Sequence, residues 1–272
     1  MKRLTILFCC LLLTAPSLWA QVDTDVATTS MNELIVVADG LSFEEYLVNQ
    51  VLENARPLKD HVKQLRYTVT CSLDKDIDLT LMPRRRMLTF AARLAGYGQI
   101  TSALMQHKRF GITMAKDVLF YDGAIHTSNL RIVASKQQLT DKQRKAFLKH
   151  DAMMGVNVYD KFYAKVRSKA KELRRKYRKR QQTGMTYIGS YTSEGRTIYR
   201  VRLDNNMIVH IVDGCWQIKA MDYTEGQNSM HFVCNEVRPD LFVLTKGSVR
   251  MYVDRQKWPK GFINMDMQYS YR

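Results

Sequence analysis

The second half of the chain consists of short runs of alternating apolar and polar residues, and turn residues separate the runs. From residue 186 onward, turn signals such as Asp213-Gly214 recur roughly every 8–13 residues, a spacing typical of all-β folds. Within one run, Tyr199, Val201 and Leu203 fall on one face, and the arginines between them fall on the other. The pattern predicts an antiparallel meander of about six or seven strands, and a sheet of that length curls to leave a concave side.

The first half mixes helical periodicity with strand-like runs. Ser42 and Glu45 form a capping box at the start of a helix predicted over 42–64, which Pro57 kinks or breaks. A second helix is predicted over 84–107, although Gly96 and Gly98 weaken it. Strands are predicted over 65–73, 110–114, 117–121 and 124–134, and the pattern allows one more over 76–82.

Two helices are expected in an insert over residues 140–182. Thr140 and Gln143 form a capping box that opens a helix to about Ala152, and a long helix follows over 158–182. The fold class is therefore predicted as α+β: a long curved antiparallel sheet, an incomplete barrel, with N-terminal and central helices packed on it. Residues 33–272 are expected to form a single domain, because the chain has ample length to bury one core.

The N-terminus has the features of a secretory signal peptide over residues 1–20. Lys2 and Arg3 give it a positive start, an apolar run follows, and Ala20 is the small residue that a signal peptidase requires. The apolar run is shorter than the roughly 20 residues that a transmembrane anchor needs, so a retained anchor is the weaker alternative. A flexible leader is expected over 21–32. The mature protein is expected in the periplasm or outside the cell, and not as an integral membrane protein.

The chain is strongly basic, with 42 Lys and Arg residues against 26 Asp and Glu and a net charge of +16. Loss of Lys2 and Arg3 with the signal peptide lowers that charge to +14. A basic surface often binds nucleic acid, but export argues against that partner and favours lipid headgroups, anionic glycans or acidic proteins. Solubility alone is an equally good explanation of the charge.

Basic residues concentrate in the predicted helix over 158–182. Val166, Ala170 and Leu173 recur there at helical spacing, so the helix is amphipathic as well as basic. Such a helix can dock on an anionic membrane surface, although a surface helix that packs its apolar side on the sheet explains the pattern at least as well. The residues predicted to contact an anionic surface are Lys165, Lys169, Arg174, Arg175, Arg178 and Lys179.

Three cysteines lie beyond the signal peptide: Cys71, Cys215 and Cys234. An oxidising compartment allows one disulfide among them. Cys215 and Cys234 lie on what look like neighbouring strands, which makes them the predicted pair. Three buried free thiols explain the sequence equally well, because directly opposite strand residues often have a geometry unsuited to a disulfide.

The sequence contains no motif for a metal or a cofactor. Asp74, Asp76 and Asp78 alternate as in a calcium loop, but Leu79 and Arg85 occupy the positions that require glycine and an acid. The histidines lack the spacing of zinc ligands, and no P-loop or dinucleotide-binding glycine motif occurs. We therefore expect no bound metal and no cofactor.

Nucleophilic catalysis has no sequence support either. There is no G-x-S-x-G motif, and the S-x-x-K match at 168–171 lacks its companion motifs. The protein is therefore expected to be non-catalytic. The alternative is a periplasmic hydrolase without a recognised motif, which would need a polar cluster in a cleft. The candidates for such a cluster are His210, His231, Asp213 and Glu236.

The hairpin pattern over 187–203, in which Gly195 precedes an alternating strand, resembles the central hairpin of periplasmic lipoprotein carriers of the LolA/LolB type and related exported proteins of Bacteroidetes. The resemblance covers mainly residues 184–255. It implies an unclosed barrel whose concave apolar face holds acyl chains beneath helical lids. The helical insert over 140–182 departs from those compact carriers, and no ligand-binding residue carries over.

These features predict an exported binding or carrier protein of the cell envelope. Its partner would be a lipid or a lipidated protein held on the concave sheet, or an anionic membrane surface. The alternative is a structural or interaction protein whose core is filled by its own helices. No nucleic-acid partner is expected, and the sequence leaves the oligomeric state open.

Overall fold

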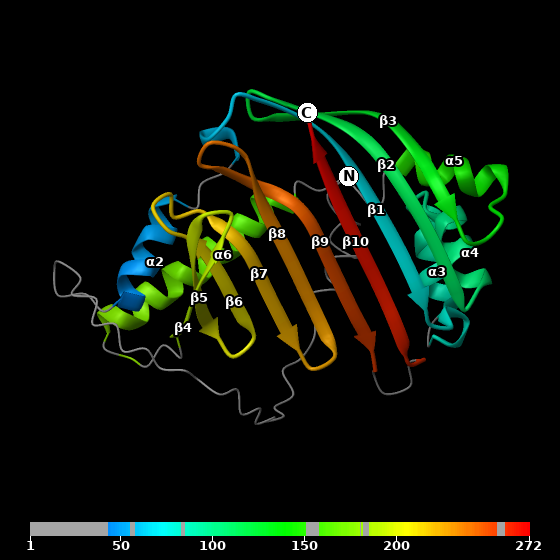
Figure 1. The fold of residues 1–272 in the computed structure, drawn as a ribbon. Coiled ribbons are helices and arrows are strands. Elements are labelled where there is room, and N and C mark those ends of the chain that lie inside the picture. The colour runs from blue at the N-terminus through cyan, green and yellow to red at the C-terminus, as the bar shows by residue number, and fades with distance from the viewer. Residues whose placement is uncertain are drawn as a thin grey trace.

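A ten-stranded antiparallel sheet forms the centre of the protein (Figure 1). The structure is a computed structural model that describes residues 43–54, 58–82, 85–150, 158–179, 181, 185–254 and 259–272. The strand order is β3-β2-β1-β10-β9-β8-β7-β6-β5-β4, and the sheet stays open with β3 and β4 at its edges. The open sheet with helices confirms the α+β class. The predicted signal peptide and leader lie outside the described residues.

Seven strands of this sheet form the predicted meander, in which each strand pairs with the next along the chain. Short turns join most of them, as at Asp204, where β5 ends before β6 begins at Met207. The prediction of six or seven strands is confirmed. The strands are β4 (Thr186–Ser193), β5 (Arg196–Asp204), β6 (Met207–Val212), β7 (Ile218–Glu225), β8 (Asn228–Arg238), β9 (Leu241–Val253) and β10 (Gly261–Tyr271).

The other three strands are β1 (Gln64–Asp76), β2 (Arg109–Tyr121) and β3 (Ala124–Ser135). β1 pairs with both β2 and β10, so it joins the first half of the chain to the meander. The prediction of two separate strands over 110–114 and 117–121 is wrong, because β2 runs through both segments and bulges against β3 instead of breaking.

The strand allowed over 76–82 is also absent. β1 ends at Asp76, and a short 3-10 helix, η2 (Leu79–Leu81), follows. The carboxylate of Asp78 caps η2, since it accepts a hydrogen bond from Thr80 N at 2.9 Å. The alternating aspartates therefore end a strand and start a helical turn.

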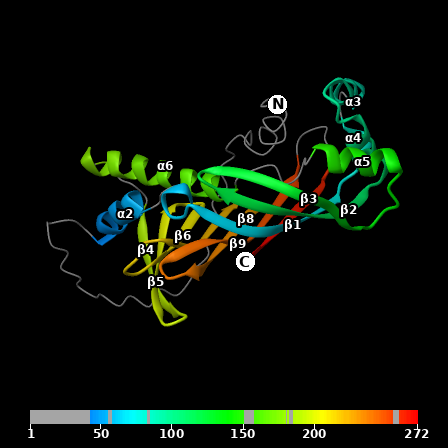
Figure 2. The same ribbon diagram turned by 90° about the horizontal axis from the view of Figure 1, so that it is seen from above.

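Two helices, α2 (Phe43–Asn54) and α6 (Val158–Arg178), pack against each other and over the β4–β6 end of the sheet (Figure 2). Phe43 makes an edge-to-face contact with Tyr187 of β4, with ring centroids 5.0 Å apart. The predicted first helix is confirmed but ends at Asn54. After the undescribed residues around Pro57, the short η1 (Leu58–Asp60) precedes β1.

Three more helices lie at the other end of the sheet: α3 (Arg85–Leu94), α4 (Gly98–Gln106) and α5 (Asp141–His150). The single helix predicted over 84–107 is two helices, because Gly96 adopts a φ of 83° that ends α3. The capping box of α5 is confirmed: Thr140 N donates to Gln143 Oε1 at 3.0 Å, and Gln143 N donates to Thr140 Oγ1 at 3.3 Å.

Both groups of helices rise from the same face of the sheet, which we call the helix face (Figure 2). Phe147 of α5 stacks on Phe110 of β2 at one end, with ring centroids 6.1 Å apart. At the other end, Val166 of α6 is buried near Val209 of β6. In the part of the chain that the structure describes, no helix is both long enough and apolar enough to cross a bilayer.

Candidate functional site

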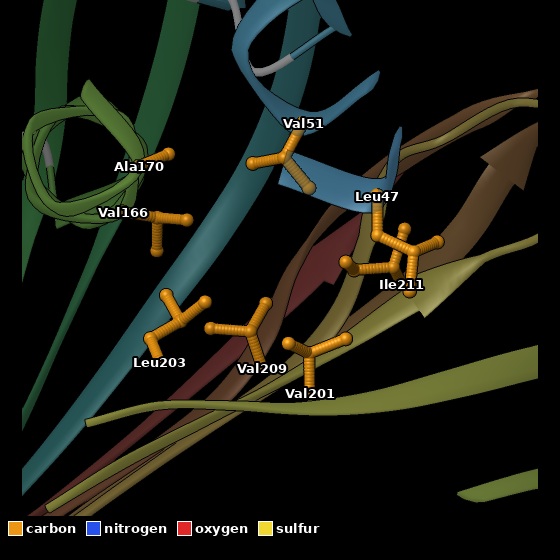
Figure 3. A pocket seen from close by; sticks show the side chains of 8 residues that line it. All are labelled: Leu47, Val51, Val166, Ala170, Val201, Leu203, Val209 and Ile211. Carbon is orange, nitrogen blue, oxygen red and sulfur yellow. The ribbon is translucent and has the colours of Figure 1, made fainter. Parts of the chain in front are cut away.

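The space beneath α2 and α6 is filled by apolar side chains that point toward one another (Figure 3). A void of only about 10 Å³ remains there. A cavity needs roughly 10–15 Å³ to hold one water molecule, so this one has no room for an acyl chain. The residues that line it are Leu47, Val51, Val166, Ala170, Val201, Leu203, Val209 and Ile211.

The middle of the helix face carries a second apolar region, which we call the methionine strip: Met230, Val249, Ile263, Met265 and Met267. Strand register places these residues on one face, since Met265 lies opposite Val249 and Val249 lies opposite Met230. Met267 is buried and the other four are half-buried. Methionine side chains adapt their shape, which suits them to surfaces that accept varied apolar ligands.

The basic helix α6 packs its apolar stripe on the sheet. Three apolar residues of this stripe are buried: Val166, Ala170 and Leu173. These residues are therefore not available for insertion into a membrane. Four of the six residues predicted to contact an anionic surface do point outward, and each is exposed: Arg174, Arg175, Arg178 and Lys179. Among the α6 side chains that the structure describes, the outer surface is therefore mainly cationic.

The remaining two predicted contact residues are placed differently. Lys169 Nζ lies 3.1 Å from Asp204 Oδ2 and 3.2 Å from Glu172 Oε2, so its charge is already compensated. Burial alone would lower the pKa of Lys169, but these two carboxylates outweigh burial and raise it. The side chain of Lys165 lies outside the described residues.

Four of the exposed large apolar side chains in the described part of the chain belong to α3 and to η2, which packs against it. Met87, Phe90 and Leu94 recur every three or four residues, so they form one stripe along α3. Their exposed fractions are 58%, 61% and 74%, and Leu81 of η2 is 67% exposed. We call these four residues the α3 stripe. Exposed apolar patches of this kind mark contact sites for proteins or membranes.

Positive charge borders the α3 stripe. Arg86 and Arg93 are exposed and lie beside Phe90 on the helix surface. Residues 79–106 contain four arginines and no aspartate or glutamate. The sequence predicted a helix here but did not show that its apolar side faces outward, because buried and exposed stripes have the same spacing.

All three described cysteines are free thiols in the structure. Cys234 lies on β8, whereas Cys215 lies in the loop before β7, so the predicted pair is not on neighbouring strands. Burial raises the pKa of both thiols, which makes them less reactive than an exposed cysteine. Cys71 is buried on β1.

Two of the histidines named as catalytic candidates meet on the outer face of the sheet, opposite the helix face. His210 Nε2 lies 3.1 Å from Asp222 Oδ2, and His231 Nδ1 bonds the other oxygen of the same carboxylate. Because a carboxylate only accepts hydrogen bonds, both imidazoles donate to it. Tyr191 Oη lies 3.1 Å from His210 Nδ1 and extends the chain of contacts to β4.

The carboxylate of Asp222 is held in its charged form. The hydrogen bond from His210 is the main cause of its lowered pKa, burial opposes the shift, and His231 adds to it. Neither the void beneath α6 nor the larger cleft described below is lined by these residues. The cluster therefore links β4, β6, β7 and β8 but has no adjoining substrate pocket among the described cavities.

The other two catalytic candidates lie apart from this cluster. Glu236 Oε1 accepts a hydrogen bond from Arg196 at 2.8 Å, and Arg196 also pairs with Asp240. Asp213 lies beside Tyr199 and helps burial to raise the pKa of that phenol to about 12. Among the described residues, no group of three His, Cys, Asp or Glu side chains is arranged to hold a metal ion.

The chain was compared with protein-family models, with curated proteins and with solved structures, and no match was found in any of them.

Proposed function

We propose that this protein is a non-catalytic binding protein of the cell envelope that attaches to an anionic lipid surface through α3. The observation that carries the proposal is the α3 stripe, in which Met87, Phe90 and Leu94 are exposed beside arginines. A helix that lies in a membrane interface has the same composition, with apolar residues on one side and cations beside them.

The energies involved suit reversible attachment. Full burial of one Phe, Leu or Met side chain contributes about 1.5–3 kcal/mol, and side chains already partly covered contribute less. Each arginine near an anionic surface adds about 1 kcal/mol at physiological ionic strength. These contributions support peripheral binding, and they fall short of the permanent insertion of a membrane-spanning helix.

The outer surface of α6 supports the same function. Arg174, Arg175 and Arg178 are exposed there, and α6 rises from the same face of the sheet as α3 (Figure 2). Cations at both ends of one face strengthen the attraction to an anionic surface without requiring α6 to insert.

Co-sedimentation with lipid vesicles tests the proposal on the unmodified protein. We expect it to bind vesicles that contain phosphatidylglycerol and to bind neutral phosphatidylcholine vesicles more weakly. Raising the salt concentration should weaken the binding without abolishing it, because salt screens the arginines and leaves the apolar contribution intact. Absence of binding to both vesicle types would exclude the proposed function.

A second candidate function, lipid carriage, is favoured by the methionine strip. The packed core beneath α2 and α6 has no room for a ligand, so a carried acyl chain would lie on β8, β9 and β10. The resemblance of residues 184–255 to lipoprotein carriers agrees with this function. Native mass spectrometry of the protein purified without detergent tests it: a bound lipid supports carriage, and a ligand-free mass in every preparation argues for surface attachment alone.

A further inference from the structure

The sheet divides at the end where β1 begins. Pairing between β9 and β10 stops where Lys246 lies opposite Gln268. Beyond this point β10 continues beside β1 as far as Tyr271. On the other side, β9 stays paired with β8 up to the contact of Leu241 with Arg238. At this end, near the C-terminus in Figure 1, β10 and β1 therefore separate from β9 and β8.

A cleft of about 400 Å³ lies at this end of the sheet, and we call it the basic cleft. Its lining contains four cationic side chains and one amide: Lys63, Arg66, Arg238, Arg272 and Gln64. Among the described residues, no acidic and no apolar residue lines it. The volume is within the range of roughly 300–1,000 Å³ that is usual for small-molecule sites.

The cations of the basic cleft are not compensated by the part of the chain that the structure describes. None of the four has an ion pair or a side-chain hydrogen bond with any residue that the structure describes. Arg272 makes only the smallest contribution to the lowered pKa of Asp117, whose carboxylate already accepts hydrogen bonds from Asn129 and Thr68. The positive charges of the cleft therefore remain unbalanced by the side chains that the structure describes.

Two of these cations lie opposite each other on neighbouring strands. Arg272 N donates a hydrogen bond to Arg66 O at 3.0 Å, directly after the pairing of β10 with β1. Like charges in opposite positions destabilise a strand pair. An anion bound between them would remove that repulsion, so the arrangement favours an occupied cleft.

We propose that the basic cleft binds a phosphate group carried by a small phosphomonoester or by a phospholipid headgroup. A phosphomonoester carries up to two negative charges, and each arginine presents a planar fork that fits two of its oxygens. The four cations come from three segments of the chain, and together they carry more positive charge than one carboxylate would neutralise. The cleft and α3 lie at opposite ends of β1, about 40 Å apart along a strand of this length, so the two sites are separate.

Isothermal titration calorimetry at low salt tests the proposal with two soluble probes. One probe is glycerol 3-phosphate, and the other is dihexanoyl phosphatidic acid below its micelle concentration. The double variant Arg66→Gln/Arg238→Gln removes two cations of the cleft. The matched control, Arg144→Gln/Lys145→Gln, removes two exposed cations from α5. A second cleft variant is Lys63→Gln. Because Lys63 lies just before β1 and not within it, this variant keeps the test valid if the double variant folds poorly.

We expect each cleft variant to weaken binding of phosphate, by about tenfold for the double variant, while the control stays within about twofold of the unmodified protein. Binding of both probes identifies a soluble phosphomonoester as a sufficient ligand. Binding of phosphatidic acid alone identifies a lipid headgroup. The proposal is overturned if neither probe binds, or if the α5 control weakens binding as much as the cleft variants do.

Failure of this test would leave the attachment through α3 untouched, because the α3 stripe shares no residue with the basic cleft. Failure of vesicle binding would likewise leave the soluble phosphate site intact.

Discussion

His210 Nε2 lies 3.1 Å from Asp222 Oδ2, and this contact joins β6 to β7 on the outer face of the sheet. His231 of β8 bonds the second oxygen of the same carboxylate, so one acid links three strands. The hydrogen bonds lower the pKa of Asp222 below its ordinary value of 3.8. A carboxylate with a lowered folded-state pKa stabilises the fold above its unfolded pKa, and that contribution is lost as the pH falls through the folded value.

We predict that Asp222→Asn lowers the free energy of unfolding by about 1 kcal/mol at pH 7, a modest value because the side chain is partly exposed. The difference between variant and unmodified protein should shrink as the pH falls below about 4, where the unfolded state takes up the proton, and it should vanish below the lowered pKa of the folded state. Urea unfolding at several pH values between 7 and 3 measures it. A difference that stays constant over this range would show that the charge of Asp222 contributes nothing.

Lys75 is buried on β1, and its ammonium group donates to three backbone carbonyls. The acceptors are Ile77 O at 2.7 Å, His107 O at 2.6 Å and Lys108 O at 2.9 Å. Burial lowers the pKa of Lys75, and the nearby aspartates only partly oppose this. The lysine therefore ties the end of β1 to the segment that leads into β2.

We predict that Lys75→Met lowers the free energy of unfolding by about 2–4 kcal/mol, because three carbonyls lose their donor. Lys246→Met, at an exposed position of β9, is the control, and it should change stability by no more than about 0.5 kcal/mol. Chemical denaturation measures both. Equal stability of the two variants would mean that the hydrogen bonds of Lys75 are not needed for the fold.

Gly261 begins β10 at a point where no side chain fits. A Cβ atom there would lie 2.1 Å from Asp76 O and 2.8 Å from Ile77 Cα, and backbone atoms cannot move aside cheaply. We predict that Gly261→Ala destabilises the protein by about 2–4 kcal/mol. Gly226→Ala is the comparison, since nothing lies within 4 Å of that Cβ and only its φ of 58° opposes the change.

Gly226→Ala should lower the free energy of unfolding by about 1 kcal/mol, because it strains the backbone and causes no clash. Thermal unfolding of both variants gives the ranking. If Gly226→Ala proves the more damaging of the two, then the close approach of β10 to the end of β1 is looser than the structure shows.

The sequence predicted those elements whose pattern is local. The meander followed from alternation and turn residues, and the capping box at Thr140 and Gln143 followed from residues three apart. The basic helix was predicted for the same reason. These features depend on neighbours along the chain, so one sequence is enough to recognise them.

The sites required knowledge of which strands lie side by side. Asp222 meets His210 and His231 only through the register of β6, β7 and β8. The basic cleft brings Arg66 together with Arg272, which is about 200 residues away in the sequence. No spacing rule connects such distant positions, and the outward direction of the α3 stripe likewise depends on what the rest of the fold leaves uncovered.

Attachment through α3 is tested most directly by vesicle co-sedimentation of two matched double variants. Phe90→Ser/Leu94→Ser removes half of the α3 stripe, and Ile125→Ser/Val133→Ser removes two exposed apolar residues from β3 as the control. With phosphatidylglycerol vesicles, we predict that the α3 variant binds at least about tenfold more weakly than the unmodified protein, while the β3 control stays within about twofold. Unchanged binding of the α3 variant, with both proteins folded, would contradict attachment through this helix.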